Sequence, residues 1–229
     1  MSTVLLIPGL LSDHAVWEPV LAHIDAQVAD LSTQSSLTDM ARDCLEHHPG
    51  PLRIAGHSMG GRVAMEITRL APERVERLAL LDTGIHPLGP GERERRSEII
   101  EFAHAWGMRR LAERWIPPML GPAQQDNPEL MEALTAMVLR MDPDLHERQI
   151  TALVNRPDAA AGLLAARCPV LLVVGRQDQW SPVAQHEEMQ ALVPQARLEI
   201  IGHAGHFAPV EQPDAVAEVL ADFLSDTGG

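Results

Sequence analysis

Leu52-Arg53-Ile54-Ala55, followed by Gly56-His57-Ser58-Met59-Gly60-Gly61, is the stretch that decides the fold. The first part is largely apolar, which predicts a buried strand, and residues 62–70 continue with apolar side chains at helical spacing. A serine between a strand and a helix lies in a tight turn with strained backbone angles, where flanking glycines remove the clash of side chains. The turn also places the hydroxyl at a helix N-terminus, which favours developing negative charge. Ser58 is therefore a candidate nucleophile.

The rest of the chain repeats this order of strand and helix. Apolar runs predict strands at residues 4–7, 26–30, 52–55, 75–81, 169–175 and 197–201. Helical spacing of apolar residues predicts helices at 13–24, 36–47, 62–70, 182–192 and 213–224. Alternating strands and helices indicate βαβ units, and continuously apolar strands are typical of a parallel sheet covered on both faces. We expect an α/β fold with a doubly wound, mostly parallel sheet of about six strands.

Residues 84–156 break this pattern. They contain no convincing strand and are rich in Arg, Glu, Met and Pro. Amphipathic spacing predicts helices at 92–105, 109–116, 128–141 and 144–154, separated by proline-containing joints. We therefore expect a helical insertion at 84–156 within a core formed by residues 1–83 and 157–229.

Composition excludes several classes of function. The formal net charge of −14 opposes binding to nucleic acid or to an anionic membrane surface. No run of about 18 apolar residues could span a bilayer, and the N-terminus lacks the pattern of a signal peptide. Cys44 and Cys168 have no metal-type or disulfide-type spacing, so we expect a cytoplasmic protein. The histidine pairs lack a third ligand nearby, so we expect no metal and no cofactor.

Two further residues could activate Ser58. Ligands of an open parallel sheet bind beyond the carboxyl ends of its strands, and both residues follow predicted strands there. His206 lies in a glycine-rich loop after the last strand and is the candidate base, with His203 as the rival. Asp178 follows the strand at 169–175 and is the candidate carboxylate that orients the imidazole, with Asp82 as the alternative.

An oxyanion intermediate needs two preorganised N–H donors. The residue after the nucleophile, Met59, supplies one, and the turn after the first strand supplies the other through Leu10 or, alternatively, Leu11. Large aromatic residues either line a pocket or pack the helical insertion onto the core. The candidate pocket residues are Leu11, Trp106, Trp115, Trp180 and Phe207.

These motifs together resemble the α/β-hydrolase superfamily, and specifically its small, lid-bearing serine esterase branch. The resemblance rests on residues 5–10, 56–61, 72–82, 175–178 and 202–213, which span nearly the whole chain outside the insertion. It implies a Ser-His-Asp triad of Ser58, His206 and Asp178 that cleaves carboxylic esters through an acyl-enzyme. It also implies that residues 84–156 form a cap over the site.

The resemblance leaves the reaction and the substrate open. The same triad serves thioesterases, C–C bond hydrolases, acyltransferases and lyases, and the fold also serves small-molecule receptors with little turnover. A small-molecule ester is the expected partner. Arg109, Arg110 and Arg114 form a basic patch on the insertion, which is either a solvated face or a dock for an acidic carrier protein.

Overall fold

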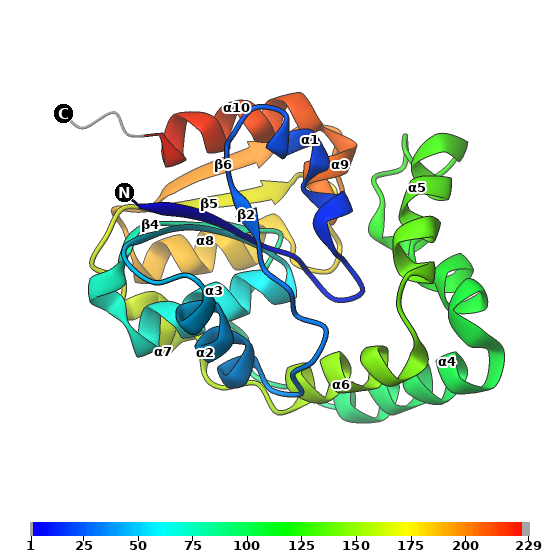
Figure 1. Ribbon diagram of the computed structural model, residues 1–229. Helices are drawn as coiled ribbons and strands as arrows, with labels where there is room; N and C mark the ends of the chain where they lie inside the picture. The colour runs from blue at the N-terminus through cyan, green and yellow to red at the C-terminus, as the bar shows by residue number, and fades with distance from the viewer. Residues whose placement is uncertain (1, 226–229) are drawn as a thin grey trace.

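The computed structural model describes residues 2–225, and a six-stranded parallel sheet runs through it in the order β2-β1-β3-β4-β5-β6. The strands are β1 (Thr3–Ile7), β2 (Gln27–Val28), β3 (Leu52–His57), β4 (Val75–Leu81), β5 (Val170–Gly175) and β6 (Arg197–Ile201). The predicted α/β fold with a parallel sheet is confirmed. Because every strand points the same way, all the carboxyl ends lie at one edge (Figure 1).

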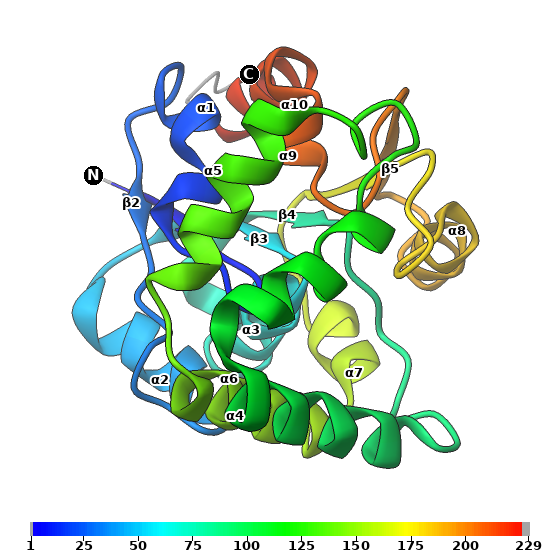
Figure 2. The same cartoon turned by 90° about the vertical axis from the view of Figure 1, so that its right-hand side faces the viewer.

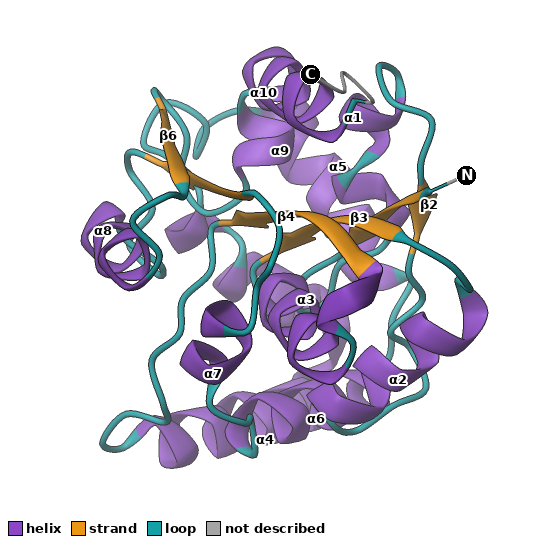
Figure 3. Ribbon diagram, turned by 90° about the vertical axis from the view of Figure 1, so that its left-hand side faces the viewer, coloured by secondary structure: helices purple, strands orange, loops and turns teal. Residues whose placement is uncertain are grey.

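Helices cover both faces of the sheet (Figure 3). One face carries α1 (Glu18–Leu21), α9 (Ala208–Glu211) and α10 (Pro213–Leu224), and the other carries α2 (Leu37–His47), α3 (Met59–Leu70), α7 (Ala159–Leu164) and α8 (Val183–Leu192). Neighbouring strand residues face opposite layers, so Leu80 packs in one apolar cluster and Leu81 in the other. Burial on both faces explains why these strands are continuously apolar.

Between β4 and β5 the chain forms α4 (Glu92–Trp115), α5 (Pro128–Leu139) and α6 (Pro143–Val154). Figure 1 shows these helices beyond the carboxyl ends of the strands, and Figure 2 views them from that side. Asn127 and Asp142 cap α5 and α6, and each is followed by a proline in the first turn. Gly107, with φ 78° and ψ 169°, interrupts α4 between the two helices that the sequence predicts there.

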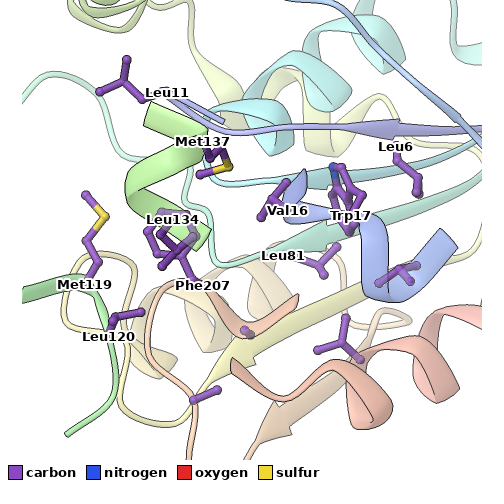
Figure 4. Close-up of a cluster of buried hydrophobic side chains, with 14 of the residues drawn as sticks. Leu6, Leu11, Val16, Trp17, Leu81, Met119, Leu120, Leu134, Met137 and Phe207 are labelled. Atoms are coloured by element: carbon purple, nitrogen blue, oxygen red, sulfur yellow. The ribbon is translucent and has the colours of Figure 1, made fainter. Parts of the chain in front are cut away.

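The inner side of α5 joins the apolar cluster on the α10 face of the sheet. Leu134 and Met137 of α5 belong to the same buried cluster as Trp17 and Phe207 (Figure 4). Met119, in the 3₁₀ turn Pro117–Met119, joins it as well. The helices between β4 and β5 are therefore packed onto the core through a shared apolar layer.

Several short elements differ from the sequence prediction. The helix expected at 13–24 is a 3₁₀ turn, His14–Val16, followed by the one-turn helix α1. The strand expected at 26–30 pairs over only Gln27–Val28, and α7 and α9 were not predicted. Such one- to two-turn helices draw their stability from tertiary packing, which leaves little periodic signal in the sequence. No helix within residues 2–225 is both long enough and apolar enough to cross a bilayer.

Candidate active site

Ser58 occupies the turn between β3 and α3 in a strained conformation. Its backbone has φ 54° and ψ −115°, a region that residues other than glycine rarely adopt. The neighbouring β4 end holds it there: the Ser58 N–H donates to the Leu81 carbonyl at 2.9 Å, and the Thr83 hydroxyl donates to the Ser58 carbonyl at 2.7 Å. Such strain costs about 1–3 kcal/mol and persists only where the surroundings impose it.

The glycines that flank Ser58 are required by close backbone approach. A Cβ atom on Gly60 would lie 2.2 Å from the Ile7 carbonyl oxygen, and one on Gly56 would lie 2.4 Å from the Gly60 carbonyl oxygen. Neither backbone can move without shifting β1 or the start of α3. The glycines thus allow the turn to lie directly against the first strand.

His206 and Asp178 meet Ser58 in one chain of hydrogen bonds. His206 Nε2 lies 2.8 Å from Ser58 Oγ, and His206 Nδ1 lies 2.8 Å from Asp178 Oδ2. An ionised carboxylate only accepts hydrogen bonds, so Nδ1 carries the proton and donates it to Asp178. Nε2 is then an acceptor for the serine hydroxyl. The geometry can therefore deprotonate Ser58 when it attacks an electrophile.

Asp178 is held as a carboxylate by its surroundings. Its Oδ1 accepts the backbone N–H groups of Trp180 at 2.7 Å and Ser181 at 3.0 Å. Burial alone would raise the pKa of Asp178, but the charge and hydrogen bond of His206 and the two backbone N–H groups outweigh it and lower that pKa.

Asp82 and His203, the two alternatives that the sequence offered, do not take part in this series of hydrogen bonds. Asp82 is fully buried and accepts the Gly175 N–H at 2.8 Å. Burial, followed by the charge of Asp178, raises the pKa of Asp82 well above its usual range. His203 is exposed, and its carbonyl accepts a hydrogen bond from Gln212.

His57 supports the loop that carries the imidazole of His206. Its buried Nε2–H donates to the His206 carbonyl at 2.7 Å. Burial, and then the charge of His206, lower the pKa of His57 to about 3, so its ring is neutral. His57 is thus a buried, neutral residue beside the turn that carries Ser58.

Glu211 is a residue of the site that sequence reasoning missed. Its buried carboxylate accepts backbone N–H groups from Gly121 at 2.7 Å, Gly205 at 2.9 Å and Phe207 at 3.1 Å. The His206 N–H in turn donates to the Met119 carbonyl at 2.7 Å. The loop of His206 is therefore tied to the segment after α4. The only signal was an acidic residue five positions after the histidine, which no spacing rule singles out.

A cavity of about 520 Å³ opens above Ser58 and His206. Of the predicted pocket residues, Trp115, Trp180 and Phe207 line it, and so do Leu10 and Met59. Two predictions were wrong. Leu11 is fully buried in the core with φ 51°, and Trp106 is 66% exposed, so neither lines the cavity.

The turn after β1 lies beside Ser58. A Cβ atom on Gly9 would lie 3.2 Å from Ser58 Cβ, so the backbone of this turn closely approaches Ser58. The Leu11 N–H already donates to the Gln149 side chain at 2.9 Å, which favours Leu10 over Leu11 as a free donor. Met59 begins α3, and the first N–H groups of a helix have no partner within it.

Comparisons with known proteins agree with this geometry. The sequence model of the alpha/beta hydrolase family matches residues 4–219. A putative 2-succinyl-6-hydroxy-2,4-cyclohexadiene-1-carboxylate synthase of Bacillus subtilis is 28% identical over 85% of this chain and 73% of its own. A pimeloyl-[acyl-carrier protein] methyl ester esterase of Nitrosomonas europaea is 25% identical over 88% of this chain and 87% of its own.

A solved structure gives a similar result. The thermophilic esterase of Thermogutta terrifontis, solved with malate bound, superposes with a TM-score of 0.89 at 28% identity, covering 98% of this chain and 89% of its own. The family match spans nearly the whole chain. The chain therefore belongs to the alpha/beta hydrolase family and is an enzyme of the serine hydrolase type.

Proposed function

We propose that the protein hydrolyses carboxylic esters, with Ser58 as nucleophile, His206 as general base and acid, and Asp178 as the carboxylate that orients the imidazole. The observation that carries this proposal is the unbroken hydrogen-bond chain from Ser58 Oγ through both ring nitrogens of His206 to Asp178. The names of the esterase relatives agree with it.

The first half of the reaction forms an acyl-enzyme. His206 Nε2 takes the hydroxyl proton while Ser58 Oγ attacks the ester carbonyl, and the carbonyl oxygen becomes an oxyanion. The N–H groups of Met59 and Leu10 stabilise that charge. The intermediate collapses, the C–O bond to the alcohol breaks, and His206 returns the proton to the leaving alcohol. Water then attacks the acyl-enzyme by the same steps and releases the acid.

Residues 84–156 act as a cap over this site, and residues 1–83 and 157–229 form the core. Support comes from the position of α4 to α6 beyond the strand ends (Figure 2). It also comes from the cavity, whose wall includes Ser58 and His206 of the core together with Trp115 and Ile150 of the inserted helices. The substrate is therefore enclosed between the two parts.

The expected compartment is the cytoplasm, and the expected partner is a small ester. Cys44 and Cys168 are free thiols; burial raises the pKa of Cys44 to about 12 and that of Cys168 to about 11. Unpaired cysteines suit a reducing compartment. The name of the Nitrosomonas relative supports a carrier-linked ester as an alternative, with the exposed Arg109, Arg110 and Arg114 as the dock.

A second function is favoured by one specific observation. The Bacillus relative is named a putative 2-succinyl-6-hydroxy-2,4-cyclohexadiene-1-carboxylate synthase, so a lyase reaction on the same three residues, without an acyl-enzyme, is the second candidate. Trapping of an acyl-enzyme separates the two functions, because only ester hydrolysis requires it.

Covalent labelling with a fluorophosphonate tests the proposal most directly. The label is expected on Ser58, and hydrolysis of p-nitrophenyl acetate and butyrate is expected in the same preparation. Ser58→Ala should abolish labelling and lower kcat about a millionfold. Ser97→Ala, at an exposed serine of α4 outside the cavity, is the matched control and should leave both unchanged. Retention of ester turnover by Ser58→Ala overturns the assignment.

A further inference from the structure

One wall of the cavity is basic, although the chain as a whole has a net charge of −14. Arg62, Arg95, Arg96 and Arg156 all line it. Among the described residues of the lining, Glu92 is the one carboxylate. A cationic wall inside an acidic protein concentrates anions at one place and repels them elsewhere.

Both carboxylate oxygens of Glu92 already accept hydrogen bonds from neighbouring groups. Its Oε1 accepts from Arg96 Nε at 2.8 Å and from Arg156 Nη1 at 2.9 Å. Its Oε2 accepts from Arg156 Nη2 and the Gly89 N–H, both at 2.9 Å. The carboxylate therefore cannot serve Arg62 as well, and the wall keeps an excess of positive charge.

Arg62 is the guanidinium left with an unpaired donor. Its Nη2 donates to the His86 carbonyl at 3.1 Å, while its Nη1 is buried without a hydrogen-bond partner. Burial, and then the charge of Arg156, lower the pKa of Arg62 to about 9, so the group is still protonated at neutral pH. A buried donor without a partner destabilises the protein, and the penalty is larger for a charged group.

His146 supplies a second, independent observation. It is fully buried, lines the same cavity, and neither of its ring nitrogens has a hydrogen-bond partner. Burial, and then the charge of His104, lower the pKa of His146 to about 4, so the ring is neutral with one N–H donor. Side chains from two different parts of the chain, α3 and α6, thus line one cavity and carry buried nitrogen atoms without a hydrogen-bond partner.

We propose that Arg62 and His146 form an anion subsite for a carboxylate carried by the substrate itself. The ester cleaved at Ser58 is then a half-ester of a dicarboxylic acid, whose free carboxylate accepts from Arg62 Nη1 and from the His146 ring N–H. The inference rests on the proposed ester hydrolysis and names its substrate class. A carboxylate suits the Arg62 Nη1 group because a hydrogen bond between two charged groups is stronger than one between neutral groups.

Arg62 and Ser58 line the same cavity and are close in the sequence. Ser58 precedes α3 with a non-helical backbone, and Arg62 lies in the first turn of that helix. On this proposal the free carboxylate is separated from the scissile carbonyl by a short chain that fits within the same cavity. Monomethyl glutarate and monomethyl adipate are suitable probes, and the cavity volume of about 520 Å³ accommodates them.

The test compares charged and neutral esters of the same acid by titrating the released protons. Wild-type protein should hydrolyse monomethyl glutarate or adipate with a kcat/KM at least about tenfold above that for the dimethyl ester, since a charge-assisted hydrogen bond is at stake. Arg62→Met keeps the aliphatic stem and should lower kcat/KM for the monoester about tenfold to a hundredfold. The dimethyl ester should be hydrolysed as before.

Arg110→Met is the matched control, because Arg110 is exposed, pairs with Glu113 and lies outside the cavity. His146→Leu provides a second variant if Arg62→Met folds poorly. It should also lower kcat/KM for the monoester and leave kcat/KM for the dimethyl ester unchanged. Equal losses for both esters in these variants, or no preference for the monoester in wild type, overturn the subsite.

A binding measurement separates this inference from the proposed function. Glutarate titrated calorimetrically into Ser58→Ala protein should bind, and should bind at least about tenfold more weakly when Arg62→Met is added. Tighter binding of inorganic phosphate than of glutarate overturns the carboxylate assignment. If fluorophosphonate labels Ser58 but the protein shows no preference for the monoester, the anion subsite is wrong and the proposed function stands. If there is neither labelling nor any ester turnover, the proposed function is wrong.

Discussion

Asp178 divides its two oxygens between two tasks. Oδ2 accepts the His206 ring proton, and Oδ1 accepts two backbone N–H groups of its own loop. In Asp178→Asn the amide oxygen stays on the loop donors, so the NH₂ group faces His206 Nδ1 and favours the wrong tautomer. We expect kcat for p-nitrophenyl butyrate to fall about ten-thousandfold with little change in stability.

Asp82→Asn is the control for that experiment, because Asp82 is the other buried acid near the site. It should retain most of the activity, since the amide oxygen can still accept the Gly175 N–H. If Asp82→Asn were the inactive variant and Asp178→Asn the active one, the carboxylate role would belong to Asp82.

The same Asp82→Asn variant makes a prediction about stability. Burial and the charge of Asp178 raise the pKa of Asp82 in the folded state. The contribution of Asp82 to the free energy of unfolding is therefore fully present below the pKa of Asp82 in the unfolded chain. It is lost as the pH rises toward the pKa of Asp82 in the folded protein. In that window one proton corresponds to about 1.4 kcal/mol per pH unit.

Urea unfolding of wild type and Asp82→Asn at a series of pH values from about 4 upward checks this. The slope of the unfolding free energy against pH reports the difference in bound protons between the folded and unfolded states. Wild type should lose stability with rising pH more steeply than the variant. Parallel curves would show that Asp82 is ionised in the folded protein.

Single residues differ in how readily a sequence reveals them. Ser58, Asp178 and His206 could be predicted because each follows an apolar strand, and parallel strands bring their carboxyl ends to one edge. Leu11 could not, because its positive φ turns the side chain into the core. Glu211 could not either, because its role depends on three backbone N–H groups that only the folded loops bring together.

At the scale of elements, the loop of His206 depends on Glu211. One oxygen of this carboxylate binds the Gly205 and Phe207 N–H groups, and the other binds the Gly121 N–H after α4. Glu211→Gln turns one of these acceptors into a donor that faces a backbone N–H. We expect about 1–3 kcal/mol lower stability in urea unfolding.

The same variant should lower kcat more than it raises KM, because the loop that it loosens carries His206, the proposed general base. Glu218→Gln on α10, outside the cavity lining, is a suitable control. A Glu211→Gln protein with wild-type stability and turnover would show that the two loops hold their positions without this carboxylate.

Elements also show where sequence prediction stops. Val75–Leu81, Arg197–Ile201 and Pro213–Leu224 have the predicted bounds, because burial on a sheet face or a helix face imposes a strong period. The one-turn helices α1 and α9 have too few residues to show a period. The direction of Trp106, on the exposed side of α4 next to the break at Gly107, depends on that break and not on helical spacing alone.

At the scale of the whole molecule, Arg156 holds the two ends of the inserted helices together. Its guanidinium donates to the His86 and Pro87 carbonyls before α4, and to both oxygens of Glu92 at the start of α4. Arg156 itself follows α6. The inserted segment therefore leaves and rejoins the core at one ion pair, which also lies in the cavity wall.

This ion pair makes the stability of the molecule depend on acid. Burial alone would raise the pKa of Glu92, but hydrogen bonds from two guanidiniums and one backbone N–H lower it from 4.5 to about 2. A depressed folded pKa contributes stability above the unfolded value, and that contribution is lost as pH falls through 4.5 toward about 2. Because Glu92 is partly solvated, the contribution is about 1–2 kcal/mol.

Glu92→Gln removes the titrating group and leaves the neighbouring guanidiniums without a counter-charge. The variant should be less stable than wild type at neutral pH, and the difference between the two free energies of unfolding should shrink as the pH is lowered below 4.5. Urea unfolding at a series of acid pH values measures that difference, with Glu94→Gln on the exposed side of α4 as control. A difference that stays constant with pH would mean that the charge of Glu92 does not hold the inserted helices to the core.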